Sequence, residues 1–151
     1  MRNSPQADVH PPQADQYSVV EFHIYTGDDD LRINSIARTE MNFADTSTEK
    51  CSFKDNGDDA WGNNSDNTIE CHLDRARTYD ELRKARIWII KQDVVNFLWG
   101  SDNWNVDKVI VTGKDPDNHA STCIWSSSGN PLIRLTGKAP KFAVEDYDTS
   151  C

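Results

Sequence analysis

Apolar and polar residues alternate with a period of two through most of this chain. In Ser18–Thr26, for example, Val20, Phe22 and Ile24 alternate with polar residues. Successive side chains of a β-strand point to opposite faces, so this pattern predicts a strand with one buried face. Further runs of the same kind are separated by Gly, Asn, Asp and Ser, and helical periodicity is nearly absent. The chain is therefore expected to fold from strands rather than helices.

Eight runs carry the strand signal, and the turn residues between them indicate antiparallel neighbours. We predict an all-β fold, an antiparallel β-sandwich of about eight strands, as a single domain over residues 17–151. Residues 1–16, which are rich in Pro and Gln, are expected to be a disordered leader. The predicted strands are Ser18–Thr26, Ser35–Phe43, Glu49–Phe53, Thr68–Leu73, Ala85–Ile90, Val106–Thr112, Thr122–Ser126 and Leu132–Thr136, with a helical turn capped by Thr78 and Glu81 before the fifth.

Only 36% of the 151 residues are hydrophobic, so the core of this sandwich must be thin and need reinforcement. Four cysteines allow three pairings. We favour Cys51–Cys71 and Cys123–Cys151, each closing a loop of roughly twenty to thirty residues and contributing about 3 kcal/mol in the chain-entropy description. Disulfides need an oxidising compartment, so a secreted protein, extracellular or periplasmic, is expected. The first residues lack the apolar segment of a signal peptide, as in a mature secreted chain with an added Met.

The chain has 25 acidic and 16 basic residues and a formal net charge of -9. A nucleic-acid partner is disfavoured, because phosphate binding needs an excess of Lys and Arg. No apolar run approaches the ~20 residues of a membrane-spanning helix. We expect a soluble monomer that attracts cations.

The densest negative charge is a run of three aspartates after the first predicted strand. Two carboxylates ~4 Å apart repel by about 4 kcal/mol at an effective dielectric constant near 20, so three must separate into water or share a cation. A second loop rich in Asp and Asn precedes Val106, and both loops are expected at one end of the sandwich. Oxygen ligands from two loops suit Ca²⁺. The alternative is a pair of solvated turns. The predicted ligands are Asp28, Asp29, Asp30, Asp102, Asn103 and Asp107.

Two of the five tryptophans, Trp88 and Trp125, lie within predicted strands and are expected in the core. The others lie beside Gly or Asn in predicted loops. One loop contains an apolar run, Val94–Trp99, and aromatic loops bind membrane interfaces or stack on sugars. The alternative is that this loop packs onto the end of the sandwich. The predicted surface-binding residues are Trp61, Phe97, Leu98, Trp99 and Trp104.

Three segments in order resemble the PLAT-like, or lipoxygenase-homology, β-sandwich domains. They are Thr26–Arg32 (TGDDDLR), Trp61–Ser65 (WGNNS) and Ser101–Asp107 (SDNWNVD), and they look most like a bacterial secreted branch with TGxDDLR, WGNxS and DNWN signatures. Leu82–Trp88 followed by Trp104–Val111 fits the order of strands in PLAT domains. The resemblance covers roughly Val19 to Thr136. Ile33-Asn34 departs from the branch, and the cysteines are not a general PLAT feature.

This resemblance implies a non-catalytic module that attaches proteins to lipid surfaces or to other proteins, in some relatives with calcium at a loop edge. The predicted function is therefore a secreted, non-enzymatic binding module that docks to a membrane surface, a glycan or another protein, with Ca²⁺ as the predicted cofactor. The alternative is a small secreted hydrolase that uses carboxylates on a sheet face, with Glu21 and Glu70 as the candidate pair. The unusual residues cluster in turns, which favours binding.

Overall fold

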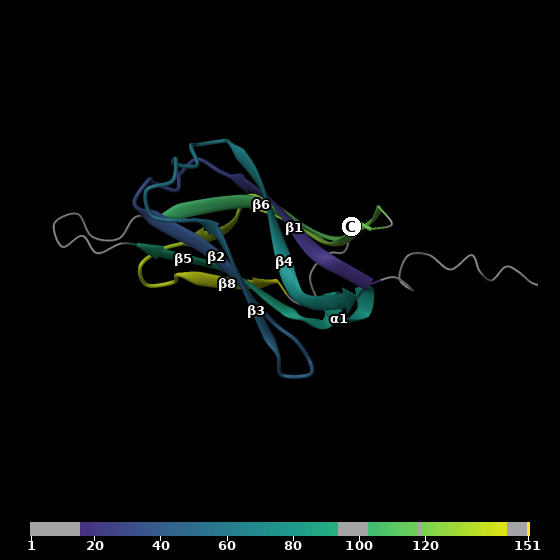
Figure 1. Cartoon of the computed structure of the whole chain (residues 1–151). Helices are drawn as coiled ribbons and strands as arrows, with labels where there is room; N and C mark the ends of the chain where they lie inside the picture. The colour runs from purple at the N-terminus through teal and green to yellow at the C-terminus, as the bar shows by residue number, and fades with distance from the viewer. Residues whose placement is uncertain (1–15, 94–102, 118, 145–150) are drawn as a thin grey trace, which may run out of the picture.

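The computed structural model of the chain describes residues 16–93, 103–117, 119–144 and 151. Two antiparallel sheets of four strands face each other (Figure 1), with strand orders β4-β1-β6-β7 and β3-β2-β5-β8. The predicted all-β sandwich is confirmed. Its strands are β1 (Gln16–Thr26), β2 (Ser35–Asn42), β3 (Thr48–Lys54), β4 (Asp66–Thr78), β5 (Arg86–Asp93), β6 (Trp104–Asp115), β7 (Ala120–Leu135) and β8 (Lys141–Val144), and α1 (Tyr79–Lys84) follows β4.

The core lies between the two sheets and is built from the residues that the period-two pattern places on one face. Phe22 and Ile24 of β1 are fully buried, as are Ile87 and Ile89 of β5. Side chains of two packed sheets interdigitate in a layer about 10 Å thick, which is why so few apolar residues are enough. Trp125 of β7 is fully buried, as predicted, and the guanidinium of Arg83 lies 3.5 Å from the centre of its ring.

The C-terminal part of the sandwich differs from the prediction in two ways. The two strands predicted at 122–126 and 132–136 form one strand, β7, because the turn residues between them make a bulge instead of a reversal. Val106 pairs with Ile133 and Lys108 pairs with Ser128, so several residues of β7 lie opposite Asp107 alone. The short strand β8 was not predicted, since four residues carry too little alternation. It pairs with β5 and completes the second sheet.

The helical turn predicted before β5 is also present, as α1. The Thr78 hydroxyl accepts a hydrogen bond from the backbone N–H of Glu81 at 3.1 Å, and the Glu81 carboxylate accepts one from the N–H of Thr78 at 3.0 Å. This reciprocal capping box satisfies two of the N–H groups that have no partner within the helix. Strand β1 begins at Gln16, the last residue of the predicted leader, and residues 1–15 lie outside the described part.

Both predicted disulfides are confirmed, and they join different parts of the sandwich. Cys51 of β3 and Cys71 of β4 have Cα atoms 5.7 Å apart, and each of these strands is an edge strand of its sheet. This disulfide therefore closes one open side of the sandwich. The second joins Cys123 of β7 to Cys151, with a Cα–Cα distance of 5.9 Å. Strand β7 is the last strand of its sheet, so the two disulfides lie at opposite edges of that sheet.

A buried ion pair reinforces the side that the first disulfide closes. The guanidinium of Arg77 in β4 and the carboxylate of Glu49 in β3 approach to 3.1 Å, and their side chains are only 3% and 5% exposed. The backbone N–H of Asp74 donates a second hydrogen bond to Glu49 at 2.7 Å. Removing one partner of such a buried pair is costly, because the other charge is left without compensation.

Candidate functional site

The loops that carry the predicted calcium ligands meet at one end of the sandwich, which we call the acidic loop end (Asp28–Asp30, Trp61–Ser65 and Asn103–Asp107). The backbone N–H of Gly27 donates to the carbonyl of Asn105 at 2.9 Å, and the N–H of Asn105 donates to the carbonyl of Asp29 at 3.0 Å. Two hydrogen bonds of 3.0 and 2.8 Å join Leu31 to Trp61. The backbone thus fixes three loops from distant parts of the sequence against one another.

Each of the three consecutive aspartates has its own partner at this end. Asp29 pairs with the guanidinium of Arg134 at 3.0 Å, and Arg134 also donates to the side-chain oxygen of Asn105 at 2.7 Å. The amide nitrogen of Asn105 donates to Asp28 at 3.0 Å. Asp30 faces the guanidinium of Arg32 at 4.0 Å. The repulsion expected from the sequence is relieved by guanidinium and amide groups, and no sequence signal pointed to Arg134.

The described ligands do not converge into a calcium site in this arrangement. Among residues 16–93, 103–117, 119–144 and 151, no group of three or more His, Cys, Asp or Glu side chains is placed to hold a metal ion. Arg134 occupies the oxygens of Asp29 and Asn105 that a cation would need. Asn103 is half-buried, and Asp107 lies against Gly27, where its carboxylate fills the space of a Cβ atom. Asp102 lies outside the described residues, so calcium binding stays a prediction.

The exposed position predicted for Trp61 and Trp104 is wrong, because both rings belong to the core. Trp61 is 7% exposed and Trp104 is 0% exposed, and the two rings meet edge to face with centroids 5.7 Å apart. The indole N–H of Trp104 donates to the hydroxyl of Thr26 at 3.1 Å. The bridge from Leu31 to Trp61 turns the loop inward, so these tryptophans close the end of the core. Phe97, Leu98 and Trp99 lie outside the described residues.

Trp88 shows the opposite difference, since it was expected in the core and lies on an outer sheet face. Its neighbours Ile87 and Ile89 point inward and are fully buried, so the alternation of β5 turns Trp88 outward. The ring is half-buried, and its N–H donates to the side-chain oxygen of Asn42 at 2.9 Å. The run Ile87–Ile90 is apolar at every position, so the sequence has no alternation there that shows which sheet face Trp88 occupies.

Four basic side chains surround this tryptophan on the outer face of the sheet β3-β2-β5-β8. The outward positions of the four strands follow from their register, in which Glu40 lies opposite both Lys50 and Trp88. Among the described side chains at these positions Glu40 is the one acid, and Lys50 is 3.6 Å from it. We call this surface the basic face and define it by Arg38, Lys50, Arg86, Trp88 and Lys141.

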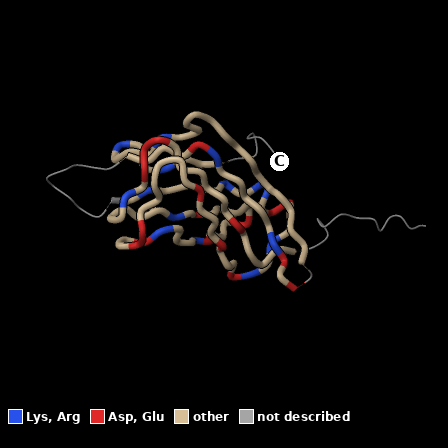
Figure 2. Tube along the Cα trace, turned by 90° about the horizontal axis from the view of Figure 1, so that it is seen from above, with Lys and Arg blue, Asp and Glu red and all other residues tan. Residues whose placement is uncertain are grey.

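Two of the four cations lie near the tryptophan ring of the basic face. The ammonium of Lys141 lies 4.8 Å from the Trp88 ring centre, and the guanidinium of Arg86 lies 5.8 Å from it. A cation over an aromatic face is attracted to the ring by the quadrupole of the ring. Basic and acidic segments are interspersed along the trace (Figure 2), so this positive surface is formed by separate strands rather than by one basic run.

The opposite outer face carries the carboxylate pair of the hydrolase alternative. Glu21 and Glu70 lie directly opposite each other on β1 and β4. The ammonium of Lys114 on β6 is 3.1 Å from Glu21 and 3.0 Å from Glu70. The hydrogen bonds to Glu70 and Glu21 raise the pKa of Lys114. A sugar would have to displace this ammonium to reach both carboxylates, and the geometry therefore favours a structural ion triad over a glycosidase pair.

Neither protein-family models nor curated proteins match the chain. Two solved structures share its fold. The alpha-toxin of Clostridium perfringens from avian strain SWCP has a TM-score of 0.63 at 13% identity, over 87% of this chain and 32% of the toxin chain. The alpha toxin of Clostridium absonum has a TM-score of 0.66 at 14% identity, over 93% of this chain and 34% of that one.

At this level of identity the likeness concerns the fold, and the chain spans about a third of the length of these toxins. It confirms the antiparallel sandwich that the PLAT-like resemblance implied. Membership of the bacterial secreted branch stays a prediction. No helix among the residues that the structure describes has the length and apolar character of a membrane span.

Proposed function

We propose that this chain is a secreted, non-catalytic module that docks to an anionic lipid surface through its basic face. The observation that carries the proposal is the gathering of Arg38, Lys50, Arg86 and Lys141 around an outward-facing Trp88. The whole chain has a net charge of -9, so a positive sheet face is contrary to its composition. An anionic membrane offers the charge that complements the four cations, and its interface accommodates an indole ring.

The energetics of this surface match weak and reversible docking. Each Lys or Arg near an anionic membrane contributes about 1 kcal/mol, and Glu40 offsets one of the four cations. The face therefore contributes about 3 kcal/mol, which corresponds to a Kd of several millimolar. Insertion of the Trp88 ring adds to this. The interaction is expected to weaken with salt, because the Debye length is about 8 Å at physiological ionic strength.

Three further features support a secreted binding module. Two disulfides are stable in an oxidising compartment. The fold is shared with a part of two alpha-toxins, which supports a module rather than a self-contained catalyst. The carboxylate pair of the hydrolase alternative is bridged by Lys114. We expect the module to act as a monomer. A module that docks to a glycan or a protein instead would bind neither kind of vesicle in the test below.

Calcium assistance at the acidic loop end belongs to the same proposal as a separate element. It would require that a calcium ion displace the guanidinium of Arg134 from Asp29 and Asn105. Released Asp29 would then join Asp28 as a carboxylate ligand beside the loop that contains Asp107. Docking through the basic face does not depend on this step.

The test is sedimentation of the protein with phosphatidylcholine vesicles that contain or lack phosphatidylserine. Binding is expected only with phosphatidylserine and is expected to decrease with salt. Lys141→Glu reverses one charge on the basic face, which removes about 2 kcal/mol and weakens binding roughly 30-fold.

The matched control is Lys108→Glu, which makes the same change of net charge on the outer face of the other sheet. It is expected to bind nearly as well as the wild type. Equal losses in the two variants would show that only the total charge matters, and the basic face would then have no role in docking.

A further inference from the structure

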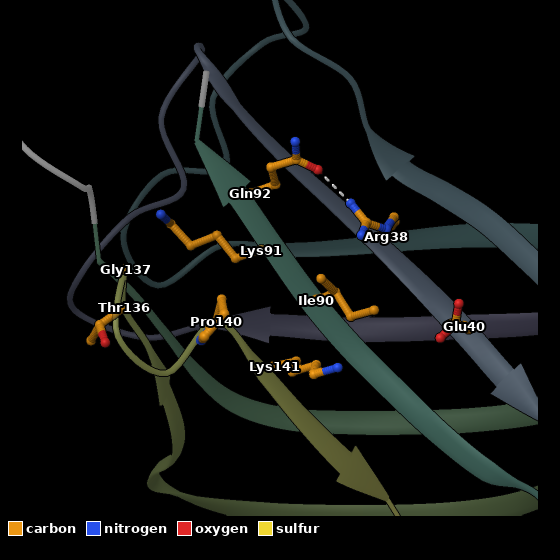
Figure 3. Close-up of a pocket in the computed structure, with 9 residues that line it drawn as sticks. All are labelled: Arg38, Glu40, Ile90, Lys91, Gln92, Thr136, Gly137, Pro140 and Lys141. Carbon is orange, nitrogen blue, oxygen red and sulfur yellow. Dashed lines mark hydrogen bonds between the residues drawn. The ribbon is translucent and has the colours of Figure 1, made fainter. Parts of the chain in front are cut away.

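A groove of about 430 Å³ runs along the basic face, between the outer surfaces of β2 and β5 and the turn that precedes β8 (Figure 3). Arg38, Glu40, Ile90, Gln92, Pro140 and Lys141 line it. Its size lies within the roughly 300–1,000 Å³ of small-molecule sites. A flat basic surface would attract any anionic membrane, whereas a groove of this size also has walls that can distinguish one headgroup from another.

Two cations stand on either side of an apolar floor in this groove. Ile90, which is only 7% exposed, lies opposite Arg38 on β2 and opposite Lys141 on β8. Since neighbouring strands are about 4.8 Å apart, the backbones that carry the two cations are separated by roughly 10 Å. The Arg38 guanidinium lies at Gln92 and the Lys141 ammonium lies over Trp88, so the two cations flank Ile90 from opposite sides. A phosphate group over Ile90 would lie between them and could accept a charge-assisted hydrogen bond from each.

The guanidinium of Arg38 is held in place by its neighbour. Its Nη1 donates a hydrogen bond of 2.6 Å to the side-chain oxygen of Gln92, drawn as the dashed line in Figure 3. This bond uses one of the five N–H donors of arginine and fixes the plane of the others. The same bond fixes the amide of Gln92, whose nitrogen points away from Arg38 (Figure 3).

Glu40, whose carboxylate lies 3.6 Å from the ammonium of Lys50, makes the groove less suited to a bare anion. Its carboxylate is 31% exposed and lines the same groove as Arg38 and Lys141. An ionised carboxylate only accepts hydrogen bonds, so it repels a second anionic group and attracts a hydroxyl. A ligand that suits both ends of the groove therefore carries one phosphate and several hydroxyl groups.

We propose, on the basis of the docking function above, that this groove binds the headgroup of a polyol phospholipid. The phosphodiester lies between Arg38 and Lys141, and a ring hydroxyl donates to Glu40, which is the next outward residue along β2 from Arg38. The ligand is a lipid rather than a free polyol phosphate, because the groove lies within the face that meets the membrane.

The decisive comparison is between phosphatidylinositol and phosphatidylserine at equal mole fraction in phosphatidylcholine vesicles. The two lipids carry the same net charge, so docking by charge alone gives equal binding. Recognition in the groove is expected to favour phosphatidylinositol about tenfold. Equal binding of both lipids would overturn the groove proposal and leave the docking function intact. Binding to neither would overturn both.

Glu40→Gln separates the two explanations, because charge changes the affinity for both lipids and recognition in the groove changes the preference between them. It removes a negative charge from the basic face, so charge alone predicts tighter binding to both lipids. Recognition in the groove predicts that the preference for phosphatidylinositol falls toward one. Glu70→Gln, on the opposite face, makes the same charge change and is expected to keep the preference. An unchanged preference in Glu40→Gln would overturn the proposal, and melting curves establish that each variant folds.

A soluble headgroup separates the lipid from a free polyol phosphate as the ligand. Glycerophosphoinositol is expected to lower binding to phosphatidylinositol vesicles to the level of phosphatidylserine vesicles, while binding the protein more weakly than the vesicles do. If it leaves vesicle binding unchanged, the groove is not the site. If it binds in solution as tightly as the vesicles do, the ligand is a soluble polyol phosphate and the lipid assignment fails.

Discussion

Arg134 supplies positive charge at the place where the sequence led us to expect a calcium ion. Its guanidinium contacts both Asp29 and Asn105, which ties the end of β7 to two loops. A guanidinium is always ionised and presents its donors in a fixed fork, so it can replace a cation between two oxygen ligands. A calcium ion at the acidic loop end would therefore have to compete with this side chain.

This competition leads to a prediction about calcium. Millimolar Ca²⁺ is expected to raise the melting temperature of the wild type, since a ligand at a hundredfold excess over its Kd stabilises by ~2.7 kcal/mol. Arg134→Gln is expected to melt lower without calcium and to gain more from it, because Asp29 is then released. Mg²⁺ is expected to do less, as it prefers a strict octahedron. If Ca²⁺ and Mg²⁺ raise the melting temperature by the same small amount, in the wild type and in Asp28→Asn alike, calcium assistance is contradicted. The effect is then general screening of the negative charge.

At the scale of elements, the carboxylate of Asp45 connects the turn after β2 to β4. It accepts hydrogen bonds from the hydroxyl and the backbone N–H of Ser47 and from the guanidinium of Arg75. These bonds, led by the Ser47 hydroxyl, hold the pKa of Asp45 well below its ordinary value of 3.8. Arg75 also lowers the pKa of Glu81 in α1, with a further contribution from the N–H of Thr78. The network joins a turn, a strand and the helix.

The pH dependence of this network follows from the direction of the shifts. A carboxyl whose pKa is lowered by folding stabilises the fold above its unfolded pKa, and the stabilisation is lost as the pH falls through the folded value. The melting temperature is expected to decrease as the pH is lowered below about 4. Asp45→Asn should flatten this decrease and melt lower at pH 7, as thermal melts from pH 7 to 2 would show. The control is Asp80→Asn, at an exposed position, which is expected to keep the wild-type dependence of melting temperature on pH. If Asp45→Asn keeps that dependence too, the pH dependence does not come from Asp45.

The elements also show what the sequence could predict and what it could not. Alternation identified β1 and β2 because one face of each is buried, and the even cysteine count with loop lengths identified both disulfides. The prediction from sequence failed for Trp61, because turn residues indicate a loop but do not indicate that the loop folds inward onto the core. It failed for Trp88 because its neighbours are apolar on both sides. The basic face could not be predicted from the sequence, because its residues come from four strands between positions 38 and 141.

At the scale of the whole molecule, the disulfide between β3 and β4 fixes the separation of the two sheets at one side. It closes a loop with a sequence separation of 20 residues, for which chain entropy predicts about 3 kcal/mol. Replacing Cys51 and Cys71 together by Ser is expected to lower the free energy of unfolding by about that amount, measured by denaturant titration. The Cys123→Ser, Cys151→Ser double variant is the comparison, with a separation of 28. If the variant without Cys51 and Cys71 is as stable as the wild type, this disulfide does not reinforce the thin core.

The basic face has one more consequence, which concerns the approach to a membrane rather than the contact itself. Four cations on one outer face of a body with a net charge of -9 give the molecule a large electric dipole moment. Within about a Debye length of an anionic bilayer the field exerts a torque on this dipole, turning the positive face inward and pushing the remainder away. If the chain docks to anionic lipid as proposed, encounters in other orientations are expected to be repelled before any side chain touches lipid. The rate of association, more than the rate of release, therefore carries the salt dependence.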